Sequence, residues 1–178
     1  KNLFVLLITA SIFMLSSCDN PTLETVDENA DLLKSGSKVL NFRTHLSGTN
    51  EVPANDSKAT GQVIFQLSKD GEELSYKLIV ANISNVVASH IHLAQAGANG
   101  GVVVWLYPSA PPSQLISGKV NGVLAEGTIT KSDLKGALAG MELSKLIENF
   151  YNDNAYVNVH TSQFPGGEIR GQITGNMP

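Results

Sequence analysis

The feature that most constrains this fold is a series of short segments in which apolar and polar residues alternate, separated by turn-forming residues. The clearest case is a pair of such segments, residues 59–67 and 74–81, joined by a connection that contains Asp70 and Gly71. Alternation with a period of two places the apolar side chains on one face of a strand. An Asp-Gly pair between two alternating runs is a strong hairpin signal. We therefore predict an antiparallel hairpin here, with one face buried.

Six further segments have the composition of short strands, and turn signals recur between them. They comprise residues 39–46, 88–93, 102–107, 119–130, 156–161 and 168–174. This pattern predicts an all-β fold, an antiparallel Greek-key β-sandwich of about eight strands. Residues 142–150 carry apolar side chains at helical spacing, which predicts a short amphipathic helix as an insert.

The first residues of the chain are expected to direct export. Lys1 precedes the apolar run Leu3–Leu15, which is shorter than the roughly 20 residues that span a bilayer. Residues 1–17 are therefore interpreted as a signal peptide. The sequence Leu15-Ser16-Ser17-Cys18 resembles the bacterial lipobox, whose cysteine is acylated and becomes the mature N-terminus. We expect lipidation of Cys18; the alternatives are a signal without a lipid, or a short anchor in which the cysteine is incidental.

Residues 18–37 are polar and acidic, which is typical of a solvated tether. We expect this tether to connect the lipid on Cys18 to a folded domain at residues 38–176. The expected location is outside the cytoplasm, on the periplasmic or cell-surface side of the membrane that holds the anchor.

Charge and cysteine usage exclude two common possibilities. The formal net charge is −4, and no basic stripe is present, so we predict no nucleic-acid partner. Cys18 is the only cysteine, so the domain is stabilised by its core without an internal disulfide. A domain of about 140 residues can bury enough surface for that.

The most informative polar residues are two histidines that lie two positions apart, His90 and His92. Alternation puts both on the face opposite Ile91, and the same argument puts His160 on the polar face of residues 156–161. All three histidines are therefore predicted on the side of the sheet away from the core. If the two strands are neighbours, the three imidazoles could bind Cu²⁺ or Zn²⁺, provided that their nitrogens converge within about 4 Å.

The alternative is an exposed polar patch without a metal. In that arrangement the three histidines form hydrogen bonds with loops and with Glu168 and Arg170, and these last two form a partly exposed ion pair. Glu51 lies in the loop sequence Asn50-Glu51-Val52-Pro53. We expect it to accept loop amides or to pair with Arg170, with a ligand role as the alternative. Glu51, Glu168 and Arg170 are thus candidate binding residues.

Four motifs in order resemble the CHRD (chordin-type) domain, over about residues 38–175. They are Leu46-Ser47-Gly48 with Asn50-Glu51-Val52-Pro53; His90-Ile91-His92 with Gly97 and Asn99-Gly100; Tyr156-Val157-Asn158-Val159-His160-Thr161; and Pro165-Gly166-Gly167-Glu168-Ile169-Arg170-Gly171-Gln172-Ile173. The resemblance implies a β-sandwich module of the kind found in many bacterial exported proteins. It implies no catalytic activity.

A weaker resemblance is to copper/zinc superoxide dismutase. It would make His90, His92 and His160 copper ligands, and Arg170 the residue that guides an anion. The chain departs from that family because no histidine lies between His92 and His160, so the bridging ligand and the zinc subsite are missing. The cysteine pair of that family is also absent.

The function predicted from the sequence is that of a membrane-anchored extracytoplasmic binding or structural module. Its partner would be an unidentified protein or polysaccharide. The module would also bind a transition metal through His90, His92 and His160. The alternatives are a copper enzyme similar to superoxide dismutase and a periplasmic copper or zinc carrier. A catalytic function is the less favoured hypothesis.

Overall fold

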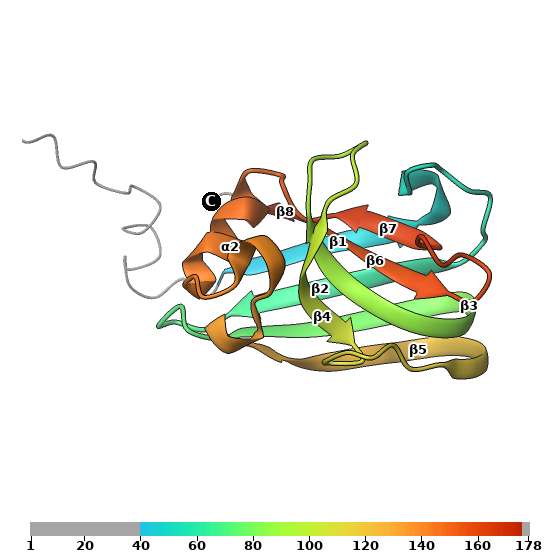
Figure 1. The fold of residues 1–178 in the computed structure, drawn as a ribbon, viewed down its shortest axis with the longest axis horizontal. Helices are drawn as coiled ribbons and strands as arrows, with labels where there is room; N and C mark the ends of the chain where they lie inside the picture. The colour runs from blue at the N-terminus through green and yellow to red at the C-terminus, as the bar shows by residue number, and fades with distance from the viewer. Residues whose placement is uncertain (1–39, 176–178) are drawn as a thin grey trace, which may run out of the picture.

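The structure, a computed structural model, describes residues 40–175 (Figure 1). The predicted signal peptide at residues 1–17, the predicted lipidation site Cys18 and the predicted acidic tether at 18–37 lie outside the described residues. No helix in the described part of the chain is long and apolar enough to cross a membrane.

Eight strands form one sheet in which every pairing is antiparallel. The sheet closes on itself through β1, β2, β3, β6 and β7, because β2 pairs with both β1 and β3. This confirms the predicted all-β, sandwich-like fold. The strands are β1 (Asn41–Ser47), β2 (Thr60–Leu67), β3 (Leu74–Leu93), β4 (Gly101–Tyr107), β5 (Ile116–Ile129), β6 (Tyr156–Thr161), β7 (Ile169–Gln172) and β8 (Thr174–Gly175).

Strand β3 corrects one prediction. Residues 74–81 and 88–93 were expected as two strands, but they are the two halves of one strand of 20 residues. Asn82 and Asn85 take left-handed backbone conformations, with φ of 57° and 56°. The pairing with β5 shifts register at both places. Asparagine tolerates this conformation better than most residues, so it bends β3 through bulges without ending it.

The long strand β3 organises the sheet around it. Its first half pairs with β2 and β5, and its second half lies between β4 and β6. Figure 1 shows β3 passing through the middle of the fold, with β5 along its outer side. The second half of β3 carries His90 and His92, so their neighbours come from β4 and β6.

The core lies inside the closed sheet, and one helix covers an end of it. Helix α2 (Leu143–Tyr151) confirms the predicted insert and buries its apolar side chains. The ring of Phe150 lies 5.2 Å from that of Phe42 and 5.3 Å from that of Phe65. Three short 3-10 turns complete the described elements: η1 (Gly48–Asn50), η2 (Lys131–Asp133) and η3 (Gly136–Leu138).

The opposite side of the second half of β3 is polar. Register across β4, β3, β6 and β7 places polar and aromatic side chains in adjacent rows. The first row is Trp105, His90, Asn158 and Arg170, and the second is Val102, His92, Tyr156 and Gln172. We call this surface the histidine face; His160, farther along β6, and Glu168, just before β7, also belong to it.

Candidate metal centre

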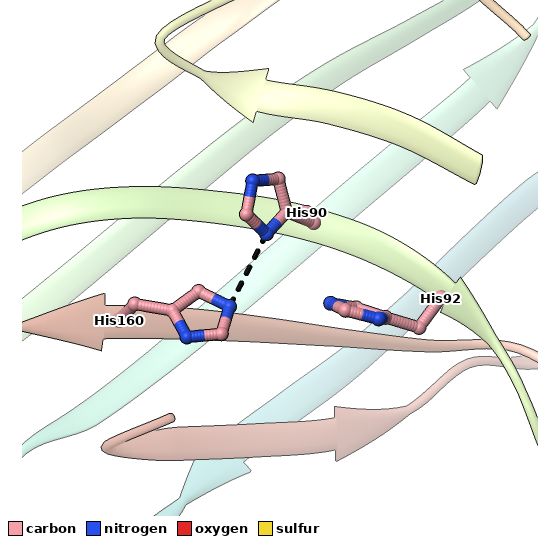
Figure 2. A group of neighbouring side chains, drawn as sticks. All are labelled: His90, His92 and His160. Carbon is pink, nitrogen blue, oxygen red and sulfur yellow. Dashed lines mark hydrogen bonds between the residues drawn. The ribbon is translucent and has the colours of Figure 1, made fainter. Parts of the chain in front are cut away.

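The three histidines predicted as a set come together on the histidine face. His90 and His92 project from β3, and His160 projects from the neighbouring strand β6. Nδ1 of His90 lies 3.2 Å from Nε2 of His160. One nitrogen from each of the three rings lies within 4.8 Å of the other two. Figure 2 shows the rings turned toward a common point, with His92 directed at the gap between the other two.

These distances approach those of a metal site. Nitrogens bound at about 2.0–2.1 Å to a tetrahedral ion are separated by about 3.3 Å. The pair His90 and His160 already meets that separation, and the third nitrogen must approach by about 1.5 Å. The separation of 4.8 Å is larger than the limit of about 4 Å that the sequence analysis set for a shared metal ion, so that condition is not met by the ring positions in this structure.

Backbone carbonyls fix the tautomers of two of the rings. Nδ1 of His92 lies 3.0 Å from the carbonyl oxygen of Gly100, and Nδ1 of His160 lies 3.0 Å from that of Pro165. A carbonyl oxygen only accepts, so both Nδ1 atoms carry the proton. Each Nε2 therefore presents a lone pair. Metal-binding histidines commonly make this kind of hydrogen bond through the nitrogen that does not bind the metal.

Burial keeps the imidazoles neutral. His90 and His92 are each 7% exposed. Burial, with the neighbouring His160 and His92, lowers the pKa of His90 to about 3. Burial is also the main reason that the pKa values of His92 and His160 are lowered. Neutral imidazole is the form that binds a metal ion.

Aromatic side chains surround two of the rings. The ring of Trp105 lies 4.3 Å from that of His90 in an edge-on contact. Tyr156 stacks on His92 with ring centroids 4.8 Å apart. The Tyr156 hydroxyl also accepts the amide of Gly100, whose carbonyl orients His92. Trp105 and Tyr156 therefore restrict the positions of the histidine rings.

Arg170 is buried and does not lie on an exposed surface. Its side chain is among the largest fully buried ones, at 1% exposed. Its guanidinium donates to the carbonyls of Ala98 and Gln95 and to the side-chain oxygen of Asn99. It also lies 3.4 Å from the centre of the Tyr156 ring. Arg170 thus holds the loop at residues 94–100 over the histidine face, and its engaged donors do not suit the steering of an anion.

Glu168 holds a second loop. Its two carboxylate oxygens accept the hydroxyls of Ser57 and Thr161, at 2.6 and 2.7 Å. Thr161 begins the turn that carries Pro165, the partner of His160. The partly exposed ion pair between Glu168 and Arg170, which belonged to the alternative without a metal, is not formed: both side chains are buried, and each is hydrogen-bonded elsewhere.

Glu51 is buried at 6% exposed, and its Oε1 has no hydrogen-bond partner among the described residues. Burial raises its pKa to about 7 against the opposing effect of Arg170. Gly167 is the reason that the carboxyl fits, since a Cβ at Gly167 would collide with that oxygen. The predicted pairing of Glu51 with Arg170 is present only as this electrostatic effect, since no hydrogen bond or ion pair joins the two side chains in the described structure.

Orphaned polar atoms concentrate on this surface. Five buried side-chain atoms in the described part of the chain have no hydrogen-bond partner. Four belong to the histidine face, and the fifth belongs to Glu51, beneath the same loops: Glu51 Oε1, His90 Nε2, His92 Nε2, Asn158 Oδ1 and Gln172 Oε1. Buried polar groups without partners are uncommon and often mark the place of a ligand, ion or water.

The predicted orientation of the histidines is confirmed. The alternative of an exposed polar patch is right in that His92 and His160 form hydrogen bonds with loops, but it is wrong about exposure. The side chains of His90 and His92 point away from the core that contains Ile91, as alternation requires. They are nevertheless buried, because loops from distant parts of the sequence cover the face. His45 is the histidine that stays outside this arrangement; it is exposed on β1, as expected.

Sequence reasoning missed the groups that support the three rings. The carbonyls of Gly100 and Pro165 leave no signature in residue type. Alternation along residues 156–161 places Tyr156 and Asn158 on the same face as His160, so their positions could have been predicted. The contacts of Trp105 and Tyr156 with the imidazoles were not predicted.

The domain is a closed antiparallel β-sheet that carries a cluster of three histidines beneath its loops, two of them buried and one half-buried. The chain belongs to the CHRD domain family, whose model matches residues 42–173. No curated protein matches the chain, and no solved structure matches it either. Membership of the family supports a binding or structural module.

Proposed function

We propose that this protein is an exported, membrane-anchored CHRD protein that binds a copper or zinc ion through His90, His92 and His160. The observation that carries the proposal is the convergence of one nitrogen from each ring within 4.8 Å. Imidazole nitrogens are ligands that both metals accept.

Two further observations support the metal site. The Nε2 atoms of His92 and His160 carry lone pairs, because each Nδ1 donates to a carbonyl. His90 would bind through Nδ1, the atom that lies 3.2 Å from His160. It then carries its proton on Nε2. A metal ion at this place would replace the contact between these two nitrogens and satisfy Nε2 of His92, which is otherwise orphaned.

The test is a metal titration of the intact protein, purified in detergent, with Cu²⁺ and Zn²⁺ in separate calorimetric experiments. Trp105 is the only tryptophan and contacts His90, so its fluorescence reports on the site. We expect one ion per protein, with quenching of Trp105 by Cu²⁺ that saturates at the same stoichiometry.

Variants assign the binding to the three rings. His90→Ala and His160→Ala should each abolish stoichiometric binding. His45→Ala is the matched control, because His45 is exposed on β1, and it should bind like the unmodified protein. Binding no tighter than about 1 mM for Zn²⁺ and for copper in both oxidation states, or binding unchanged in His90→Ala, would overturn the metal proposal. A protein or polysaccharide partner would then be the remaining candidate for this CHRD module.

The membrane anchor is proposed from the sequence around Cys18, and the location outside the cytoplasm follows from the same segment. The test is fractionation of cells that express the protein, followed by mass spectrometry of its N-terminal peptide. We expect acylation at Cys18 and recovery with membranes, and loss of both in Cys18→Ser. Recovery of an unmodified Cys18 in the soluble fraction would contradict the anchor.

A further inference from the structure

The donor set on the histidine face carries no negative charge. The cluster that could hold an ion consists of three imidazoles, and no carboxylate of the described residues joins it. Three neutral ligands do not reduce the charge of the ion that they bind. A divalent ion would therefore keep its full charge of two at this place, whereas Cu⁺ would keep a charge of one.

The site is also poorly solvated. His90 and His92 are each 7% exposed, and Trp105 and Tyr156 lie against them. Moving an ion from water to such a place costs free energy, because the surroundings are less polarisable. In the Born description this cost rises with the square of the charge, so it is roughly four times larger for a divalent ion than for a monovalent ion of the same size.

A fixed positive charge lies on the same face. The guanidinium of Arg170 is 3.4 Å from the centre of the Tyr156 ring, and Tyr156 stacks on His92. Arg170 is fully buried, so water screens its charge only weakly. Its repulsion of a bound ion grows in proportion to the charge of that ion.

The two nearby carboxyl groups form no hydrogen bond with the three rings in the described structure. Glu168 accepts hydrogen bonds from the hydroxyls of Ser57 and Thr161. Glu51 is buried, and its raised pKa of about 7 means that a substantial fraction is protonated near neutral pH. Arg170, through the ring of Tyr156, is thus the charged side chain that the described contacts connect to His92.

Coordination number also favours Cu⁺. Zn²⁺ held by three imidazoles takes a water as its fourth ligand, and Cu²⁺ prefers square-planar or tetragonal sites. The cluster offers three nitrogens, so a divalent ion would need a further ligand from water in a poorly solvated place. Cu⁺ has a filled d shell and accepts three ligands without the preference for a square plane.

We propose that the three histidines select copper in its monovalent state, and that Arg170 is a specificity-determining residue that disfavours divalent ions. This inference rests on the proposed function, because it requires a metal at the same three rings.

The experiment compares Cu⁺ with Zn²⁺ on the intact protein in detergent, without oxygen. Cu⁺ is supplied with ascorbate as reductant, and its affinity is measured by competition with a chromophoric Cu⁺ chelator. Zn²⁺ affinity is measured by competition with a zinc indicator. We expect one Cu⁺ per protein, bound at least about a hundredfold more tightly than Zn²⁺. Both affinities should be lost in His160→Ala.

Charge variants test the role of Arg170. Arg170→Met removes the charge and should narrow the preference for Cu⁺ by about tenfold, whereas Arg170→Lys should keep it. Glu51→Gln removes a buried carboxyl group that interacts electrostatically with Arg170, and it should widen the preference for Cu⁺. If Arg170→Met does not fold, the role of the local charge is tested with Glu51→Gln and with the reduction potential of the bound copper. The potential of the unmodified protein should exceed that of hydrated copper. It should rise further in Glu51→Gln.

The outcomes separate the two proposals. Zn²⁺ binding at the histidines as tight as Cu⁺ binding overturns monovalent selection but leaves the metal site intact. A preference that does not respond to either charge variant overturns the role of Arg170. If neither ion binds stoichiometrically, both proposals fail.

Discussion

The two faces of the second half of β3 are similarly buried but differ in what fills them. On the inner face Ile91 packs with the apolar core and is fully buried. On the outer face His90 and His92 are each 7% exposed, among polar atoms that lack hydrogen-bond partners. Burial of apolar area stabilises the fold, whereas burial of polar atoms without partners opposes it. The inner face therefore explains why the domain folds, and the outer face is arranged for a ligand.

The comparison predicts that the largest loss of stability follows truncation in the core. Phe150→Ala removes a fully buried ring that contacts Phe42 and Phe65. We expect a loss of about 3–5 kcal/mol in the free energy of unfolding, measured by urea denaturation. Ile64→Ala, at a side chain that is 40% exposed on β2, should cost less than about 1 kcal/mol. Similar losses in the two variants would contradict the assigned core.

Beside the outer face, a smaller loss is expected from one added methyl group. Gly167 has a φ of 132°, and a Cβ there meets the carboxyl of Glu51. Gly167→Ala should therefore destabilise the protein by roughly 1–3 kcal/mol. Gly166→Ala is the matched control, since a Cβ there contacts nothing, and its stability should be nearly unchanged. Equal stability of the two variants would show that Glu51 does not occupy the described position.

Acid should destabilise the protein through the histidine face. The pKa of His90 is about 3 in the folded protein and 6.5 in its reference state, so the unfolded chain binds the extra proton between these values. Stability from this group is present above pH 6.5 and is lost as the pH falls toward 3, by at most about 1.4 kcal/mol per pH unit.

The measurement is urea denaturation of the metal-free protein and of His90→Gln at intervals from pH 7.5 to about 4. The variant should lose less stability than the unmodified protein over the acid range. Glu51 acts in the opposite direction, because its raised pKa favours folding below pH 4.5 and loses that contribution as the pH rises toward 7. Identical acid profiles for the two proteins would contradict the burial of His90.

The smallest effect tests the loop that covers the histidines. Tyr156→Phe keeps the ring that stacks on His92 but removes the hydroxyl that accepts the amide of Gly100. We expect a loss of about 1 kcal/mol in stability, with faster hydrogen exchange at the Gly100 amide. An unchanged exchange rate there would mean that this hydrogen bond does not hold the loop.

The sequence was sufficient for the fold and for the direction of the histidines, because both depend on local alternation. The hairpin around Asp70 and Gly71 and the helix that buries Phe150 lie where they were expected. The continuity of β3 was not predictable in the same way. From the sequence, Asn82 predicts the end of a strand. The register of the pairing with β5 shows that it lies at a bulge within a continuous strand.

Burial of the candidate site could not be predicted because it depends on contacts between distant segments. Asn99 donates to the carbonyl of Val52, and Arg170 donates to that of Ala98. Each contact joins residues that are far apart in the sequence, through backbone atoms that every residue type carries. Alternation along residues 168–174 predicts only that Arg170 points away from the core. It does not predict that the loops bury the side chain.

X-ray absorption spectroscopy of the copper-loaded intact protein counts the ligands of the bound ion. We expect three imidazole nitrogens at about 2.0 Å from copper, with the signal lost in His90→Ala and kept in His45→Ala. A first shell with fewer than three imidazoles, or one that survives in His90→Ala, would contradict the assignment of His90, His92 and His160 as a single metal centre.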